Sequence, residues 1–204
     1  MITIYGQARS SAGRCLWCLE EAGVSYENKM VDMKTKEHKS EAFLKINPNG
    51  KVPALQDGSV TLFESMAINF YIADKYKPEL LGVTSEERAL AYQWSFWASA
   101  ELQDPIINVF IQKVFMPEEK RSQAVIDENM EKLPVLFTTL DNALAGKTYL
   151  NGKTFSLADL NTASVASIAP HIGIDMSSYK NIDLWMKAIS DRPAFQRYSA
   201  LRKG

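Results

Sequence analysis

The segment from Asn47 to Ala67 contains the densest group of candidate binding residues in the chain. Two short apolar runs within residues 54–63 flank an Asp57-Gly58 turn, which is the pattern of a β-hairpin. Glu64 and Ser65 follow directly and precede apolar residues at helical spacing. We therefore expect both at a helix N-terminus, where unpaired backbone N–H groups attract anions.

Pro53 stands at the start of the first of these runs. Proline lacks a backbone N–H, so the strand should begin there rather than include it. A cis Val52-Pro53 bond is expected, because it would present the backbone of Val52 to an extended peptide ligand, which could pair with it as a β-strand does.

Ser10 and Ser11 lie at the predicted junction of the first strand and the first helix. A hydroxyl at a helix start can donate to an anion such as a thiolate, and the helix dipole favours the same charge. The serine that is not the donor is expected to cap the helix. Tyr5 is a second candidate donor, although it lies within the predicted strand.

Cys15 and Cys18 form a Cys-Leu-Trp-Cys sequence, which in other contexts indicates a redox pair or half of a zinc site. A reactive thiolate pair starts at a helix N-terminus, whereas Cys15 lies about one turn inside the predicted helix. A zinc site needs four ligands, and His38 and His171 are the only histidines. We interpret both thiols as core residues and predict no metal site.

Periodicity predicts alternating strands and helices in the first part of the chain, in the order βαβαββα. Gly23 ends the first helix as a C-cap. The predicted elements are a strand at Ile2–Tyr5, a helix at Ala12–Ala22, a strand at Tyr26–Asp32, a polar helix or irregular segment at Lys36–Lys45, the hairpin, and a helix at Met66–Lys75.

Only helices are predicted after a linker at residues 78–84, which Pro78 begins. Ser156 and Asp159 have the spacing of a capping box, flanked by Phe155 and Leu160 as a hydrophobic staple. The predicted helices run from Glu86 to about Phe115 with a kink at Pro105, from Pro117 to Leu144, from the Ser156 cap onward, and from Ile182 to Ser190.

Composition excludes several classes of function. The chain has 204 residues, 46% of them apolar, and a net charge of −1 with both signs interspersed. Neither a nucleic acid nor an anionic membrane surface is therefore an expected partner. No apolar run has the length of a membrane span, and the N-terminus lacks a signal-peptide pattern. We therefore expect a cytoplasmic protein.

The motifs Asn-Pro-x-Gly-Lys-Val-Pro-x-Leu and Glu-Ser-x-Ala-Ile resemble the glutathione-binding half of a cytosolic glutathione S-transferase. The resemblance covers nearly the whole chain and is closest to serine-type, bacterial or theta/zeta-like members. It implies an α/β thioredoxin-like domain over residues 1–77, the linker 78–84, and an all-α helical-bundle domain over residues 85–204.

The same resemblance implies roles for individual residues. Ser10 lies four residues before Arg14, as the catalytic serine of serine-type members does, and Ser11 is the alternative. The glutathione ligands implied are His38 and Lys51 for the glycyl carboxylate, Val52 with the adjoining Pro53 for the cysteinyl backbone, and Glu64 with Ser65 for the γ-glutamyl end.

The implied function is conjugation of glutathione, a co-substrate, to small apolar electrophiles, a detoxification reaction. The electrophile would bind between the two domains, near Trp94, Trp97 or Phe110, although an aromatic stripe on a helix is also typical of a core. A glutathione-dependent disulfide reductase or isomerase, and a non-catalytic adaptor of the same fold, are the alternatives. The family also implies a homodimer.

Overall fold

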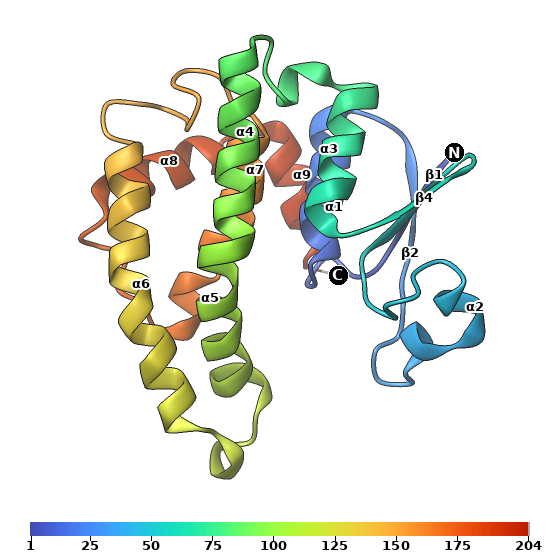
Figure 1. Ribbon diagram of the computed structural model, residues 1–204, viewed down its shortest axis with the longest axis horizontal. Coiled ribbons are helices and arrows are strands. Elements are labelled where there is room, and N and C mark those ends of the chain that lie inside the picture. Colours follow the sequence, from blue (N-terminus) through green and yellow to red (C-terminus); the bar gives the residue numbers. More distant parts are fainter. Residues whose placement is uncertain (204) are drawn as a thin grey trace. The chain divides into compact units, whose positions relative to one another are not determined.

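The computed structural model describes residues 1–203 (Figure 1). Its contacts divide the chain into two compact units. The first unit comprises residues 1–83 together with the C-terminal residues from Ser190 onward, and the second unit comprises residues 84–189. The first contiguous segment ends within the predicted linker, and the chain returns to the first unit near its C-terminus.

The first unit contains a four-stranded mixed sheet in the order β2-β1-β3-β4. β1 pairs in parallel with β2 and antiparallel with β3, which forms the hairpin with β4. Ile2 and Ile4 are buried, whereas the residues between them are half-buried, as expected of a strand packed on one face. The strands are β1 (Ile2–Tyr5), β2 (Tyr26–Lys29), β3 (Ala54–Asp57) and β4 (Val60–Phe63).

Two helices, α1 (Ala12–Ala22) and α3 (Ser65–Tyr76), pack together on one side of this sheet. The short segment η1 (Glu37–Lys39) and helix α2 (Glu41–Leu44) lie on the other side in Figure 1. Gly23 ends α1 in the left-handed conformation with φ of 67°. The predicted βαβαββα order is therefore confirmed.

Two local predictions in this unit were wrong. The second strand ends at Lys29 rather than Asp32, because β1 offers only four residues and its last one, Tyr5, pairs with Lys29. The hairpin loop lies one residue later than predicted, since Asp57 pairs with Val60 and belongs to β3.

Asp57 connects the hairpin to α3. Its carboxylate accepts hydrogen bonds from Lys75 Nζ at 2.6 Å, from the Tyr71 hydroxyl at 2.8 Å and from the Tyr76 hydroxyl. The hydrogen bond from Lys75 is the largest of the interactions that lower the pKa of Asp57 to about 2. The end of the hairpin is thus anchored to the C-terminal half of α3.

The second unit consists of helices. The first of them continues through two π-helical turns, and the first turn, at 98–102, comes before Pro105 rather than at it. The helices and turns are α4 (Ser85–Trp97), η3 (Ala98–Leu102), α5 (Gln103–Phe110), η4 (Ile111–Phe115), η5 (Glu118–Lys120), α6 (Gln123–Ala143), α7 (Leu157–Ala166), η6 (Ala169–Ile172) and α8 (Lys180–Ser190).

Helix α6 begins six residues later than predicted. Pro117 starts a separate 3-10 turn, and Arg121 after it is extended. Ser122 then caps α6, because its hydroxyl accepts a hydrogen bond from the Val125 N–H at 3.4 Å.

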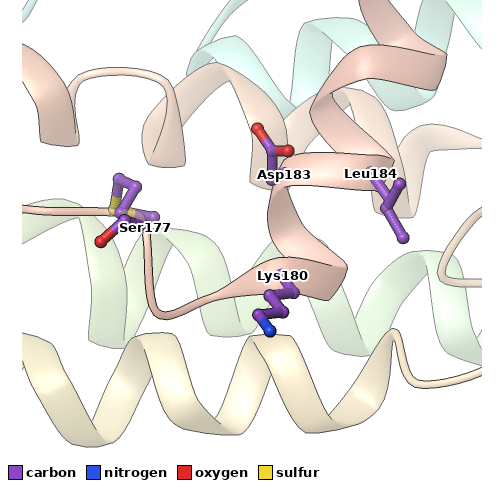
Figure 2. Close-up of a pocket in the computed structure, with 5 residues that line it drawn as sticks. Ser177, Lys180, Asp183 and Leu184 are labelled. Carbon is purple, nitrogen blue, oxygen red and sulfur yellow. The ribbon is translucent and has the colours of Figure 1, made fainter.

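A surface cavity of about 620 Å³ lies at the start of α8 (Figure 2). None of the candidate site residues lines it. Its lining residues are Met176, Ser177, Lys180, Asp183 and Leu184.

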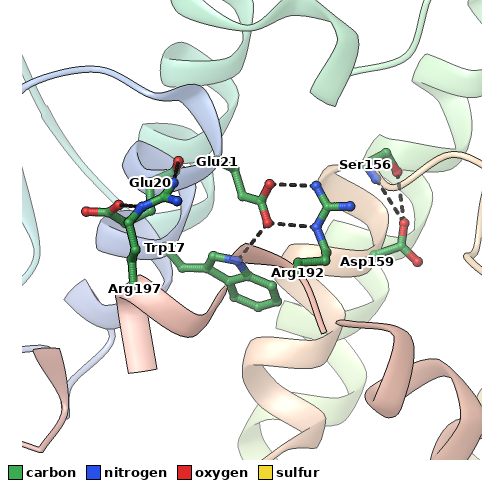
Figure 3. Close-up of polar contacts among 7 residues, drawn as sticks. All are labelled: Trp17, Glu20, Glu21, Ser156, Asp159, Arg192 and Arg197. Atoms are coloured by element: carbon green, nitrogen blue, oxygen red, sulfur yellow. Dashed lines mark hydrogen bonds and ion pairs between the residues drawn. The ribbon is translucent and has the colours of Figure 1, made fainter. Parts of the chain in front are cut away.

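The predicted capping box of Ser156 and Asp159 at the start of α7 is present (Figure 3). Asp159 is fully buried, and its carboxylate accepts from the backbone N–H and hydroxyl of Ser156. The same carboxylate accepts from the Leu150 N–H and from Trp185 Nε1, both at 2.8 Å. One side chain therefore joins α7, the preceding turn and α8.

Burial raises the pKa of Asp159 from its ordinary value of 3.8 to about 6. A carboxyl whose pKa is raised on folding contributes stability below its unfolded pKa, and this contribution is lost as the pH rises through the folded pKa. We therefore expect the stability advantage of the native chain over Asp159→Asn to be largest near pH 4. It should shrink by about 3 kcal/mol by pH 7, as measured by denaturant unfolding.

Asp57→Asn is the matched control, because the pKa of Asp57 is lowered rather than raised. Its stability cost should be present at pH 7 and should disappear as the pH falls toward 2. An Asp159→Asn cost that grows between pH 4 and pH 7 would contradict the assignment of a buried, hard-to-ionise carboxyl.

Candidate functional site

Ser10 is engaged at the start of α1. Its hydroxyl donates to the Gln7 carbonyl at 2.7 Å and accepts from the Ala12 N–H at 3.2 Å. Ser11 occupies the N-cap position of α1, is exposed, and makes no side-chain capping hydrogen bond. The Ser10 hydroxyl has one proton, which can be redirected to an arriving anion by rotation about its C–O bond.

Gly6 lets the loop that carries Ser10 approach the Val52 segment closely. Its φ is +130°, and a Cβ added to it would lie 2.7 Å from the Ala12 Cβ and 3.1 Å from the Val52 Cβ. The start of α1 and the segment before Pro53 are therefore neighbours. This close approach requires a glycine at position 6.

The Val52-Pro53 peptide bond is cis, as expected. Val52 lies between the Pro-Asn-Gly turn and β3, and its side chain packs with Val31, Phe43 and Ala54. Among residues 1–203, no hydrogen bond joins the Val52 backbone N–H or C=O to another residue. Both groups can therefore pair with an extended peptide.

Glu64 and Ser65 begin α3, as predicted, and Glu64 does so in a strained conformation. Its φ is 70° and its ψ is 109°, a region that side-chain-bearing residues rarely adopt. The Glu64 side chain is exposed and forms no cap on the helix. Within the described part of the chain, the Glu64 carboxylate is thus held at the helix start without capping it.

His38 and Lys51 come from two segments that touch. A Cβ added to Gly50 would lie 2.9 Å from the His38 carbonyl oxygen and 2.8 Å from Lys39 Nζ. His38 is half-buried, and its Nδ1 is buried without a hydrogen-bond partner among the described residues. Lys51 is exposed.

Lys39 is a candidate that the sequence analysis missed. Its ammonium group donates to the Asn49 carbonyl at 3.2 Å and lies beside Gly50. A second cation next to His38 was visible in the sequence. Its proximity to the segment before Lys51 depends on the fold.

Three other candidates, one tyrosine and two cysteines, have structural contacts. The Tyr5 hydroxyl donates to Gln56 Oε1 at 2.6 Å. Cys15 and Cys18 are fully buried free thiols, as predicted for core residues. No cluster of three or more His, Cys, Asp or Glu side chains suited to a metal occurs among residues 1–203.

The aromatic candidates lie in the second unit. Trp94 is buried against Trp97, with ring centroids 5.2 Å apart, and its carbonyl accepts from the Thr162 hydroxyl. Phe110 contacts Phe115 edge to face at 5.5 Å. Trp94 is therefore part of the core of its unit, whereas Phe115 is 71% exposed.

The C-terminal helix α9 (Pro193–Leu201) packs against α1 within the first unit. Arg192 forms a bidentate ion pair with Glu21, which also accepts from Trp17 Nε1 (Figure 3). Arg197 Nε donates to the Glu20 carboxylate at 2.6 Å, and its Nη2 donates to the Glu20 backbone carbonyl. Near the other end of α1, Arg9 Nε donates to the Arg202 carbonyl at 2.8 Å, so the loop before Ser10 is also attached to this segment.

Comparison with protein-family models matches both parts of the chain. Residues 2–74 match the model described as "Glutathione S-transferase, N-terminal domain", and residues 102–193 match "Glutathione S-transferase, C-terminal domain". Within residues 1–203, no helix has the length and hydrophobicity needed to cross a membrane.

Relatives over the full length agree with the family models. Glutathione S-transferase 4 of Zea mays is 37% identical over 95% of this chain and 89% of its own length. The glutathione S-transferase I from maize in complex with an atrazine glutathione conjugate is 37% identical, with a TM-score of 0.88 over 99% of this chain and 98% of its own.

A theta class glutathione S-transferase from Xanthomonas axonopodis pv. citri, with glutathione bound, is 35% identical. Its TM-score is 0.89 over 96% of this chain and 95% of its own. Because the relatives include plant enzymes, the expected bacterial or theta/zeta-like subclass is not exactly matched. The match of both domain models and of these full-length relatives shows that the chain belongs to the glutathione S-transferase family.

Proposed function

We propose that this enzyme transfers the glutathione thiolate to small apolar electrophiles, with the whole glutathione site built in the first unit. The observation that carries the proposal is the convergence of three segments. Gly6 brings the Ser10 loop against Val52, and Cys15 of α1 contacts Ser65 at the start of α3. Glutathione has a thiolate, an extended backbone and a charged γ-glutamyl end. These match the Ser10 loop, the Val52 segment and the start of α3, respectively.

Each segment has a chemical task in this proposal. Val52 pairs its free backbone groups with the cysteinyl residue of glutathione. His38 and Lys51, with Lys39 beside them, attract the glycyl carboxylate. Glu64 binds the γ-glutamyl ammonium, and Ser65 with the N–H groups of the α3 start binds its carboxylate.

Ser10 is the proposed catalytic donor. A thiol with a pKa near its ordinary value is mostly protonated at neutral pH, and only the thiolate is an effective nucleophile. The thiol proton leaves to solvent, and the Ser10 hydroxyl rotates from the Gln7 carbonyl to donate to the sulfur. The thiolate then forms the bond to the electrophilic carbon, and the leaving group departs with the electron pair.

The maize relative bound to an atrazine glutathione conjugate supports an aryl electrophile as the class of second substrate. We further propose that the enzyme is a cytoplasmic homodimer that acts in detoxification, as the family implies. Retention on immobilised glutathione tests binding, turnover of a generic aryl halide tests the transfer reaction, and the sedimentation mass tests the homodimer.

Glu64 should strengthen glutathione binding, while its positive φ lowers the stability of the fold. Glu64→Ala and Glu64→Gly should both weaken glutathione binding about thirtyfold, or about 2 kcal/mol, because the ligand's ammonium loses its charge partner. The Gly variant should be about 1 kcal/mol more stable than the Ala variant, since glycine adopts a positive φ without strain. Calorimetric titration and denaturant unfolding measure the two effects.

Asp74→Ala is the matched control, because Asp74 is an exposed carboxylate near the other end of α3. It should bind glutathione normally. Unchanged affinity in both Glu64 variants would reduce Glu64 to a favourable charge at the helix start.

Alanine substitutions of Ser10 and Ser11 should have different effects on kcat/KM. Ser10→Ala should lower kcat/KM for an aryl halide at pH 6.5 by about ten- to a thousandfold, the range for loss of one preorganised donor to an anion. It should also lose about 1 kcal/mol of stability, because its oxygen accepts from the Ala12 N–H. Ser11→Ala should keep nearly full activity, and the reverse pattern would move the catalytic role to Ser11.

A further inference from the structure

Helices α1 and α3 are joined by three contacts that each run from a buried side chain of one helix to a backbone carbonyl of the other. Cys15 Sγ donates to the Ser65 carbonyl at 3.4 Å, and Cys18 Sγ donates to the Asn69 carbonyl at 3.7 Å. In the opposite direction, Asn69 Nδ2 donates to the Arg14 carbonyl at 3.3 Å. We call these five residues the α1–α3 seam.

The seam fixes the register of the two helices. Cys15, Cys18 and Asn69 are each 0% exposed, so their polar groups have no access to water. A helix carbonyl can accept a second hydrogen bond on its free lone pair, but only a side chain at the matching height can reach it. Sliding one helix along the other would break all three contacts and leave buried polar groups unsatisfied.

The end of the seam formed by Cys15 and Ser65 lies at the proposed glutathione site. Ser65 is the first residue of α3 and directly follows the strained Glu64. Cys15 is the fourth residue of α1, whose start carries Ser10. Burial raises the pKa of the Cys15 thiol to about 12, so it remains a protonated donor at physiological pH.

We propose that Asn69 and Cys15 are positioning residues, which set the separation of the two helix N-termini that hold the sulfur and the γ-glutamyl end of glutathione. The proposal rests on the proposed glutathione site. Neither the Asn69 side chain nor the Cys15 side chain contacts glutathione in the proposed site. They act through the Ser65 carbonyl and the Arg14 carbonyl, one at the start of each helix.

The test combines affinity with stability. Asn69→Leu keeps the side-chain size and removes the bridge to α1, and Cys15→Ala removes the donor to Ser65. Both should bind glutathione about tenfold more weakly by calorimetric titration, at a temperature where the variants are folded by circular dichroism. Cys15→Ser retains a donor at the same place and should bind within about twofold of the native chain.

Asn129→Leu is the control for a purely structural effect. Asn129 is 5% exposed and links α5 to α6 in the second unit by accepting from Asn108 Nδ2. This variant should lose a comparable free energy of unfolding and keep native glutathione affinity. The seam proposal predicts that affinity and stability are lost together only in the first unit.

Several results would overturn the proposal. Native affinity in folded Asn69→Leu would do so, as would an equal loss in Asn129→Leu or an equal loss in Cys15→Ser and Cys15→Ala. If Asn69→Leu does not fold, the Cys15 pair decides. If Glu64→Ala binds glutathione weakly but the seam variants bind it with native affinity, only the positioning role of the seam is rejected. If Glu64→Ala binds glutathione with native affinity, the proposed glutathione site is rejected, and the role of the seam with it.

Discussion

Burial of helix α1 is the constraint on which the first unit depends. Every residue from Ala12 to Leu19 is buried, because the sheet, α3 and α9 all pack against this helix. A helix enclosed in this way cannot shift or rotate without breaking contacts on several sides. The loop carrying Ser10 therefore meets the Val52 segment at a fixed place. A side chain at Gly6 would collide with Ala12 and Val52 there.

The C-terminal segment holds α1 near the C-terminal end of that helix. Glu20 and Glu21 near its C-terminus pair with Arg197 and Arg192. Trp17 stacks on Tyr198 with ring centroids 5.9 Å apart and nearly parallel planes. Bidentate Arg pairs with a partly buried carboxylate are among the stronger ion pairs, because the fork geometry limits their freedom. The residues from Ser190 onward thus contribute to the glutathione half of the enzyme although they are last in the chain.

Under the proposed mechanism, the strained Glu64 and the hydrogen-bonded Ser10 are the parts of the site that respond to a bound ligand. Glu64 is held at a positive φ by α3 and the hairpin, which Asp57 ties together. The Ser10 hydroxyl donates to the Gln7 carbonyl, and the proposed mechanism requires this proton to turn to a stronger acceptor. A thiolate is such an acceptor, since hydrogen bonds to charged groups are about twice as strong as those between neutral groups.

Local sequence signals predicted the parts of the structure that depend on neighbours in the chain. The capping box at Ser156 and Asp159, the C-cap at Gly23 and the helix start at Glu64 all follow from side chains and the backbone within a few residues. The hairpin was predicted but its loop was misplaced by one residue. Asp57 is drawn into the strand, where its carboxylate bonds with α3, and that partner lies far along the chain.

Long-range packing accounts for the remaining misses. The docking of α9 on α1 and the link from Asp159 to Trp185 join residues that no local pattern connects. The start of α6 was misplaced because both Pro117 and Ser122 have the chemistry of a helix start. The hydrogen bond from Ser10 to the Gln7 carbonyl depends on the conformation of the loop, and Lys39 entered the candidate site through its contact with Gly50.

The central claim is that the Ser10 hydroxyl stabilises a bound thiolate. The most direct measurement is the ultraviolet absorbance of the thiolate in the glutathione complex, titrated against pH for the native chain, Ser10→Ala and Ser11→Ala. The account predicts that only Ser10→Ala shifts the midpoint upward, by about one pH unit or more. A Ser10→Ala complex that titrates with the native midpoint would contradict it.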